Sequence, residues 1–137
     1  MFLTSLQDTS VHIYELTSAG DNMAAQQQLT QPGAVLDVSY SRDGKYLAAA
    51  DGNRNIYVYT LPDFKAIVTT HWAVHTARVN SIEWSPDSAH LCSAGLDCAL
   101  AVLDPTKIST YNKCPGTSST PTCFVRFCSL KVSCCTK

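Results

Sequence analysis

The chain has 137 residues, enough for one domain, and its net charge of −1 points by itself to no particular class of partner. It contains no run of about 18 apolar residues, which excludes a membrane-spanning helix. Residues 1–8 have no basic start and no long apolar run, so we do not interpret them as a secretory signal. Without export, the cysteines are expected as thiols rather than disulfides.

Short strands joined by turns are predicted from the N-terminus onward. Residues 11–16 alternate between two faces, as a strand does. Residues 23–30 have a composition that favours helix, but the repeat described below makes them an outer strand. Turns are predicted at 41–44 and 51–54, which are rich in Asp, Asn and Gly. The complete set of predicted strands is 2–5, 11–16, 23–30, 35–40, 46–50, 56–60, 65–70, 79–84, 90–94 and 99–103.

A repeat with a period of 44 residues runs through the middle of the chain. Residues 31–60 align without a gap with the residues 44 positions later. The end of a third copy lies 45 residues further back, where Ile13 aligns with Val58. A period of roughly 40–45 residues with several short strands is typical of β-propeller blades. The aligned pairs include Val35 with Val79, Tyr40 with Trp84, Ser41 with Ser85, Asp43 with Asp87 and Leu47 with Leu91.

The composition changes at about residue 104. Residues 1–104 hold all eleven acidic residues and carry a net charge of −6, whereas residues 105–137 carry +5 and five of the seven cysteines. The tail has no match to the repeat, and residues 111–121 resemble a loop. We therefore predict an all-β fold over 1–104, a partial β-propeller of about two blades plus part of a third. Residues 105–137 are expected to form an irregular, Cys-rich basic tail that is disordered or not a family segment, as a retained intron or shifted reading frame would produce.

The repeat resembles the WD-repeat family. In the last copy His75, Ser93 and Asp97 stand where that family has its His, Ser and Asp, while Leu103-Asp104 replaces the usual Trp-Asp. The middle copy is degenerate at the same places, which hold Gln31, Ala49, Asn53 and Tyr59.

A narrower similarity is to the C-terminal propeller of the actin-interacting branch of this family, of which the chain would be a truncated fragment. It covers about residues 1–104 and includes residues 71–79 and 83–87. The resemblance implies a non-catalytic cytoplasmic protein of the cytoskeleton that binds actin filaments and, with cofilin, promotes their disassembly. Two alternatives remain: a WD-repeat scaffold for another complex, or a truncated product without independent activity.

His75, Ser93 and Asp97 permit two interpretations. They have the residue types of a hydrolase triad. The repeat register instead places them in the WD-family network, in which buried polar groups satisfy one another. No Gly-x-Ser-x-Gly elbow surrounds Ser93, so we predict a structural hydrogen-bond network and no catalytic residue.

No cofactor or metal is predicted. The tail cysteines lack the close Cys-x-x-Cys pairs of structural zinc sites, and the tail has no His. No glycine-rich phosphate loop occurs. The five basic residues of the tail are spread out, so neither nucleic acid nor membrane is expected as a partner. The tail cysteines are Cys114, Cys123, Cys128, Cys134 and Cys135.

Two surfaces are candidates for protein contacts. His71 and Trp72 lie in the loop that enters the last copy, and an exposed Trp is a frequent contact residue. The alternative is that Trp72 caps the blade edge. Open blades also expose strand edges and apolar faces, which favours self-association.

Overall fold

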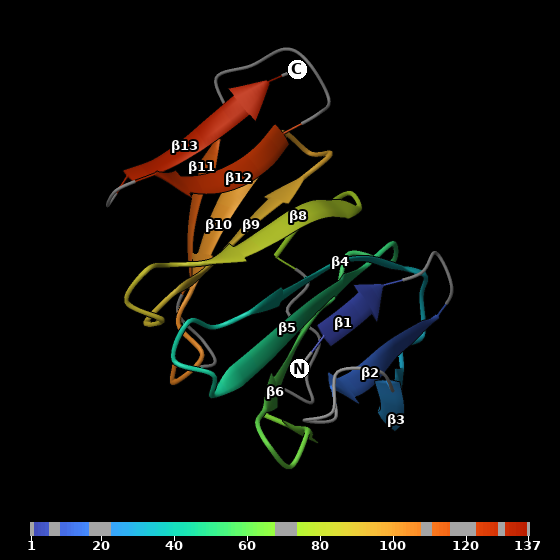
Figure 1. Ribbon diagram of the computed structural model, residues 1–137. Helices are drawn as coiled ribbons and strands as arrows, with labels where there is room; N and C mark the ends of the chain where they lie inside the picture. Colours follow the sequence, from blue (N-terminus) through green and yellow to red (C-terminus); the bar gives the residue numbers. More distant parts are fainter. Residues whose placement is uncertain are drawn as a thin grey trace.

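Antiparallel sheets make up the computed structural model (Figure 1). It describes the backbone of residues 2–5, 9–16, 23–67, 74–107, 111–115, 123–128 and 131–136, and the side chains within 9–14, 27–67 and 74–107. These parts contain no helix, and therefore none that could cross a lipid bilayer.

Three of the sheets correspond to the predicted blades. The first blade has the strand order β1 (Phe2–Ser5), β2 (Ser10–Leu16), β3 (Met23–Thr30). The second blade is β4 (Val35–Tyr40), β5 (Tyr46–Asp51), β6 (Ile56–Thr60), β7 (Lys65–Ala66). The third blade is β8 (Val79–Trp84), β9 (Leu91–Gly95), β10 (Ala99–Leu103), β11 (Tyr111–Pro115). A separate hairpin joins β12 (Cys123–Cys128) to β13 (Lys131–Thr136).

Backbone pairing and turn conformation repeat at positions 44 residues apart. Tyr40 pairs with Leu47 across the second blade as Trp84 pairs with Leu91 across the third. The register shifts between Val35 and Asp37, and again between Val79 and Ser81. Gly44 and Ser88 end equivalent turns with φ of 70° and 59°, a conformation that glycine adopts readily and that strains serine. The two blades are therefore copies of one backbone design.

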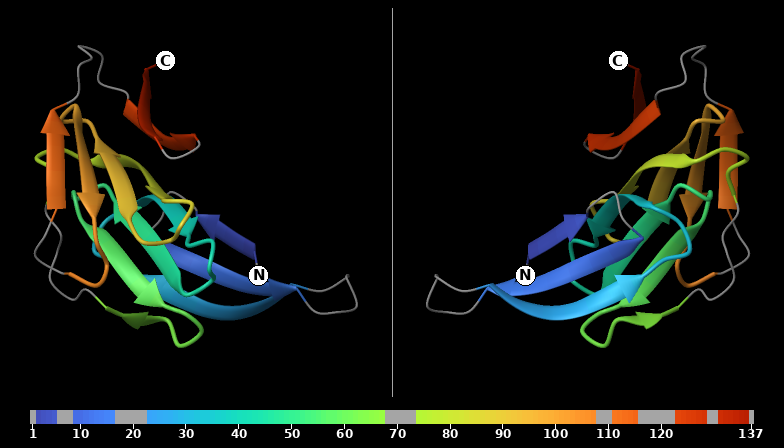
Figure 2. Two further views of the ribbon diagram at one scale, coloured as in Figure 1. Left: turned by 90° about the vertical axis from the view of Figure 1, so that its left-hand side faces the viewer. Right: turned by 90° about the vertical axis from the view of Figure 1, so that its right-hand side faces the viewer.

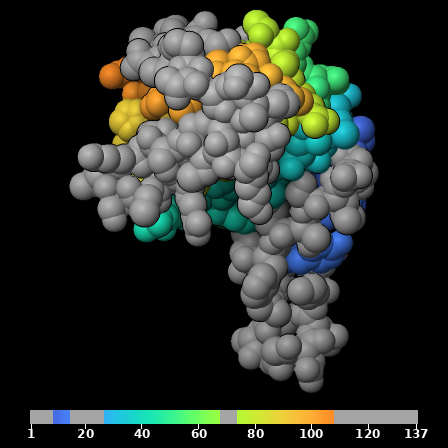
Figure 3. Space-filling view, turned by 90° about the horizontal axis from the view of Figure 1, so that it is seen from above, coloured from blue at the N-terminus to red at the C-terminus, as the bar shows by residue number. Residues whose placement is uncertain are grey.

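The second and third blades bury apolar side chains on both faces, because successive residues of a strand point to opposite sides. On β5, Leu47 and Ala49 pack toward the first blade, whereas Ala48 and Ala50 pack toward the third. The sheets stand side by side like the blades of a fan (Figures 1 and 2). In space-filling view the third blade, yellow to orange, lies against the cyan and green second blade (Figure 3).

We call the contact between the first and second blades the first junction, and that between the second and third blades the second junction. The first junction is formed by Val11, Ile13, Leu29, Val35, Leu47, Ala49, Tyr59 and Phe64. The second junction is formed by Ala48, Ala50, Ile56, Val58, Val74, Val79, Ile82, Trp84, Leu91, Ala101 and Leu103.

The outer face of the third blade is also apolar. Cys92 and Ala94 are fully buried there, with Leu100 and Val102 packed beside them. These four residues occupy the repeat positions of Ala48, Ala50, Ile56 and Val58, which the third blade covers at the second junction. The hairpin strand β12 lies against β8 and β9 (Figure 1).

The structure differs from the irregular tail expected after residue 104. Residues 111–115, expected in a loop, form β11, which pairs with β10 along its whole length. An exposed strand edge presents unpaired N–H and C=O groups that bond to almost any extended segment, so side-chain patterning does not reveal such a partner. The predicted strand 65–70 is shorter, with β7 limited to Lys65–Ala66 among the described residues. The division into a domain over 1–104 and a tail over 105–137 stays a prediction.

The second junction yields a stability prediction. Leu91 is fully buried in it, so Leu91→Ala should lower the free energy of unfolding by about 2–5 kcal/mol by leaving a cavity. Urea unfolding followed by tryptophan fluorescence and by circular dichroism measures this. Leu96→Ala, at a partly exposed position, is the matched control and should have a smaller effect. Equal losses for the two variants would contradict the proposed role of the junction.

Candidate functional site

The structure brings the three predicted network residues together. His75 Nδ1 lies 2.9 Å from a carboxylate oxygen of Asp97, and His75 Nε2 lies 2.8 Å from the hydroxyl of Ser93. Because an ionised carboxylate only accepts hydrogen bonds, Nδ1 donates to Asp97, and in the neutral imidazole Nε2 accepts from the Ser93 hydroxyl. The imidazole is therefore satisfied at both nitrogens.

Asp97 also fixes the backbone around the histidine. Its carboxylate accepts hydrogen bonds from the backbone N–H of Thr76 at 2.9 Å and of Ala99 at 3.2 Å. Gly95 makes room for this arrangement, since a Cβ there would lie 2.5 Å from His75 Nδ1. The network thus ties the segment before β8 to the turn between β9 and β10.

The burial of this network is inconsistent with hydrolysis. Ser93 has no exposed surface and His75 is 2% exposed, so a substrate cannot reach the serine oxygen. We propose a structural role for the three residues, which the repeat register also predicts.

In the middle copy of the repeat, a different hydrogen bond forms at the positions equivalent to this network. The side-chain amide of Gln31, which stands where His75 does, donates to the Tyr59 hydroxyl. Burial raises the pKa of that hydroxyl, and the bond from Gln31 opposes the shift. Gln31 and Tyr59 were noted in the sequence only as degenerate positions; the 44-residue register could have paired them.

A second buried polar group in this copy is Asp51. Its carboxylate, fully buried, accepts from the Asn55 backbone N–H at 2.8 Å and from the Asn55 side-chain amide at 3.1 Å. The Tyr57 hydroxyl lies 3.4 Å from the same carboxylate, and burial together with the Asp51 charge raises the pKa of Tyr57 to about 12. Sequence analysis assigned Asp51 only to a turn.

Asp37 links the second and third blades, a role the sequence analysis missed. One of its carboxylate oxygens accepts from Val38 N–H at 2.9 Å and the other from Ile82 N–H at 2.8 Å. Burial is the main cause that raises the pKa of Asp37; these hydrogen bonds oppose the shift and the nearby Glu83 charge adds to it. No local motif marks this residue, because its partner lies 45 positions away on another blade.

Trp84 provides another link across the second junction. Its indole N–H donates to the Ser39 carbonyl at 3.1 Å, and its ring stacks on Tyr46 with 5.5 Å between ring centres. The Asp43 N–H donates to the Ser88 hydroxyl at 3.1 Å. The inner strand β4 and its turn therefore bond to the third blade at three places.

The turns at this end of the blades present charge to solvent. Hydrogen bonds from hydroxyl groups hold the pKa values of Asp43, Asp87 and Asp104 below their ordinary range. Lys45 lies 3.5 Å from Asp43, and Lys107 lies 3.8 Å from Asp104. A cavity of about 290 Å³ lies among these turns, between the two blades. We call the surface formed by the turns that contain Asp43, Asp87 and Asp104 the rim.

Two further kinds of site were considered in the sequence, a metal site and a protein-contact site at His71 and Trp72. In the part of the chain with described side chains, no three His, Cys, Asp or Glu residues gather as a metal site requires. His71 and Trp72 lie outside the described residues. Their assignment as contact residues stays a prediction.

Comparisons with known proteins identify the family of the repeat. The family described as "WD domain, G-beta repeat" matches residues 25–60 and 66–104. The chain is 39% identical over 103 residues to Actin-interacting protein 1 of Drosophila melanogaster, which is 73% of this chain and 17% of that protein. Identity to Actin-interacting protein 1 of Caenorhabditis elegans is 31% over 106 residues, 77% of this chain and 17% of that protein. Identity to WD repeat-containing protein 1-A of Xenopus laevis is 32% over 109 residues, 79% of this chain and 18% of that protein. The chain thus spans less than one fifth of the length of these relatives.

The His75 network makes a prediction about stability. Asp97→Ala removes the acceptor of a buried imidazole N–H and should lower the free energy of unfolding by about 1–3 kcal/mol. Urea denaturation measures the loss. Asp63→Ala, at an exposed position, should change stability by less than about 0.5 kcal/mol. An unchanged urea midpoint for Asp97→Ala would argue against the structural role.

The raised pKa of Asp37 predicts that the free energy of unfolding depends on pH. A carboxyl whose folded pKa is raised contributes stability that is present below the unfolded pKa and is lost as pH rises through the folded pKa. Asp37→Asn cannot ionise and should lack this loss, although one of the two backbone donors loses its acceptor. The stability of the wild-type chain relative to the variant should therefore fall from acidic toward neutral pH.

The measurement is the urea midpoint of both proteins across that pH range. The informative quantity is the change of their difference with pH, because the substitution also alters the absolute stability. A difference that stays constant, or one that changes in the opposite direction, would contradict the assigned pKa shift.

Proposed function

Because the chain belongs to the WD-repeat family, we propose that it is a non-catalytic interaction module that binds actin filaments and acts with cofilin in their disassembly. The similarity to two proteins named Actin-interacting protein 1 carries the proposal, since it extends over about three quarters of this chain. Cytoplasmic placement at the cytoskeleton is part of the same proposal.

The polar groups of the blades support a binding role rather than catalysis. His75 and Ser93 bond to each other inside the third blade, and Asp51 is enclosed by donors from its own turn. These side chains serve to hold strands and turns in place. Groups used in this way are not available to a substrate.

The rim of the second and third blades is the surface we favour for a partner. Its turns are held rigid by internal bonds, for example from the Ser41 hydroxyl to Asp43 at 2.6 Å. A preformed loop loses little conformational freedom on binding, so more of the contact energy appears as affinity. Charges of both signs on this rim favour a polar protein surface as the partner.

Co-sedimentation with actin filaments tests the proposal. The 137-residue chain should enter the pellet with filaments, and more of it should do so when cofilin is present. A sample without actin controls for self-aggregation. Asp97→Ala at a temperature where it is unfolded serves as the matched variant, and filaments should add nothing to the amount that its actin-free sample pellets.

A different result would select another function. Chain that stays in the supernatant with and without cofilin, while circular dichroism shows it folded, would contradict actin binding. That result would favour a WD-repeat scaffold for another complex.

A further inference from the structure

The outer face of the third blade carries a continuous apolar patch. Across β9 and β10, Cys92 pairs with Val102 and Ala94 pairs with Leu100, so the four residues adjoin one another. We call these four residues the outer patch. Cys92 and Ala94 have no exposed surface, although this face is turned away from the second blade. Another segment of the chain must therefore cover the outer patch.

The hairpin of β12 and β13 lies on this side of the blade. Its strand β12 lies against β8 and β9. Figures 1 and 2 show the red hairpin on the side of the third blade that faces away from the green second blade. The hairpin lies beyond the family match, which ends at residue 104, and its sequence has no match to the 44-residue repeat. The segment on this face is thus not a further copy of the repeat.

The pairing register makes the hairpin amphipathic. Residues directly opposite each other in an antiparallel pair share a face, and the face alternates along each strand. Arg126 and Lys131, the two charged residues of these strands, fall on one face. The opposite face, which we call the apolar hairpin face, is apolar apart from one threonine. Its positions are Cys123, Val125, Phe127, Val132, Cys134 and Thr136.

We propose that the hairpin is a cap, which docks its apolar hairpin face on the outer patch and so prevents a second copy of the chain from binding there. The two faces match in chemistry, and this orientation leaves both charged residues of the hairpin toward water. An uncovered apolar patch on a sheet favours association with a similar surface, and a second copy supplies one. The inference does not depend on actin binding.

Two aspartate substitutions on opposite faces of the hairpin test the cap in the full chain. Val125→Asp places a charge on the apolar hairpin face, whereas Ser133→Asp places the same charge on the other face. The readout is the rate at which N-ethylmaleimide modifies Cys92, followed by peptide mass spectrometry. Val125→Asp should speed this reaction about tenfold or more, because an unpaired charge is costly to bury. Ser133→Asp should leave the rate as in the wild type.

Two checks separate release of the cap from general unfolding. Cys98 is partly exposed in the turn after β9, so its modification rate should be the same in all the variants. Val125→Ala, a milder change at the same position, should give an intermediate rate at Cys92 while circular dichroism stays that of the wild type. Equal Cys92 rates in Val125→Asp and Ser133→Asp would overturn the proposal.

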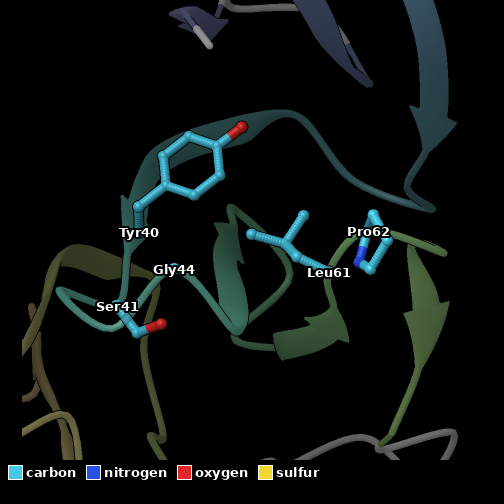
Figure 4. Close-up of a pocket in the computed structure, with 5 residues that line it drawn as sticks. All are labelled: Tyr40, Ser41, Gly44, Leu61 and Pro62. Atoms are coloured by element: carbon cyan, nitrogen blue, oxygen red, sulfur yellow. The ribbon is translucent and has the colours of Figure 1, made fainter.

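A different apolar surface serves as a control for self-association. The second blade has a cavity of about 480 Å³ that is lined by Tyr40, Ser41, Gly44, Leu61 and Pro62. The side chains of Tyr40, Leu61 and Pro62 border this open space (Figure 4). A charge introduced at Leu61 therefore alters this surface and leaves the outer patch intact.

Sedimentation velocity tests what the cap prevents. Val125→Asp should form dimers at concentrations at which the wild type is monomeric. Adding Val102→Asp, which puts a charge on the outer patch itself, should restore the monomer, whereas adding Leu61→Asp should not. Dimers that persist with Val102→Asp, or a monomeric Val125→Asp chain whose Cys92 reacts rapidly, would refute the assigned role.

Discussion

The structure depends on the requirement that both faces of the second and third blades be covered. A strand places alternate side chains on opposite sides, and in β5 and β9 both sets contain buried apolar residues. No single blade can bury two apolar faces by itself, so each blade is stable only against its neighbours. The second junction meets this requirement with Leu91 and Trp84 from one blade against Ala48 and Val58 from the other.

Hydrogen bonds from polar groups fix the relative position of the blades, which apolar contact alone does not determine. The carboxylate of Asp37 and the carbonyl of Ser39 accept donors from the third blade, which fixes how far one inner strand lies along the next. Within the third blade, His75 joins Asp97 and Ser93 and so fixes a turn against a strand. Such a framework presents surface turns rigidly, as an interaction module requires.

The repeat explains how much could be predicted. Because residues 31–60 and the residues 44 positions later share one backbone, most of the strands and turns could be predicted from the internal alignment. The position of His75 beside Ser93 and Asp97 was predicted from the resemblance to the WD-repeat family. The bond between Asp37 and Ile82 did not, since it crosses between blades and the third copy has Ser81 where the second has Asp37. The strand β11 was also missed, because backbone pairing at an edge leaves little trace in side-chain pattern. Asp51 was missed because a turn residue and a buried acceptor have the same sequence signature.

Native-state hydrogen exchange tests the central claim that the junctions make the blades one cooperative unit. The slowest amides of β5 and of β9 should open with the same free energy, and urea should lower both values with the same slope. Opening of β9 at a clearly lower free energy and with a smaller slope than β5 would contradict the claim. The blades would then be independently stable sheets, and the second junction would be only a contact between them.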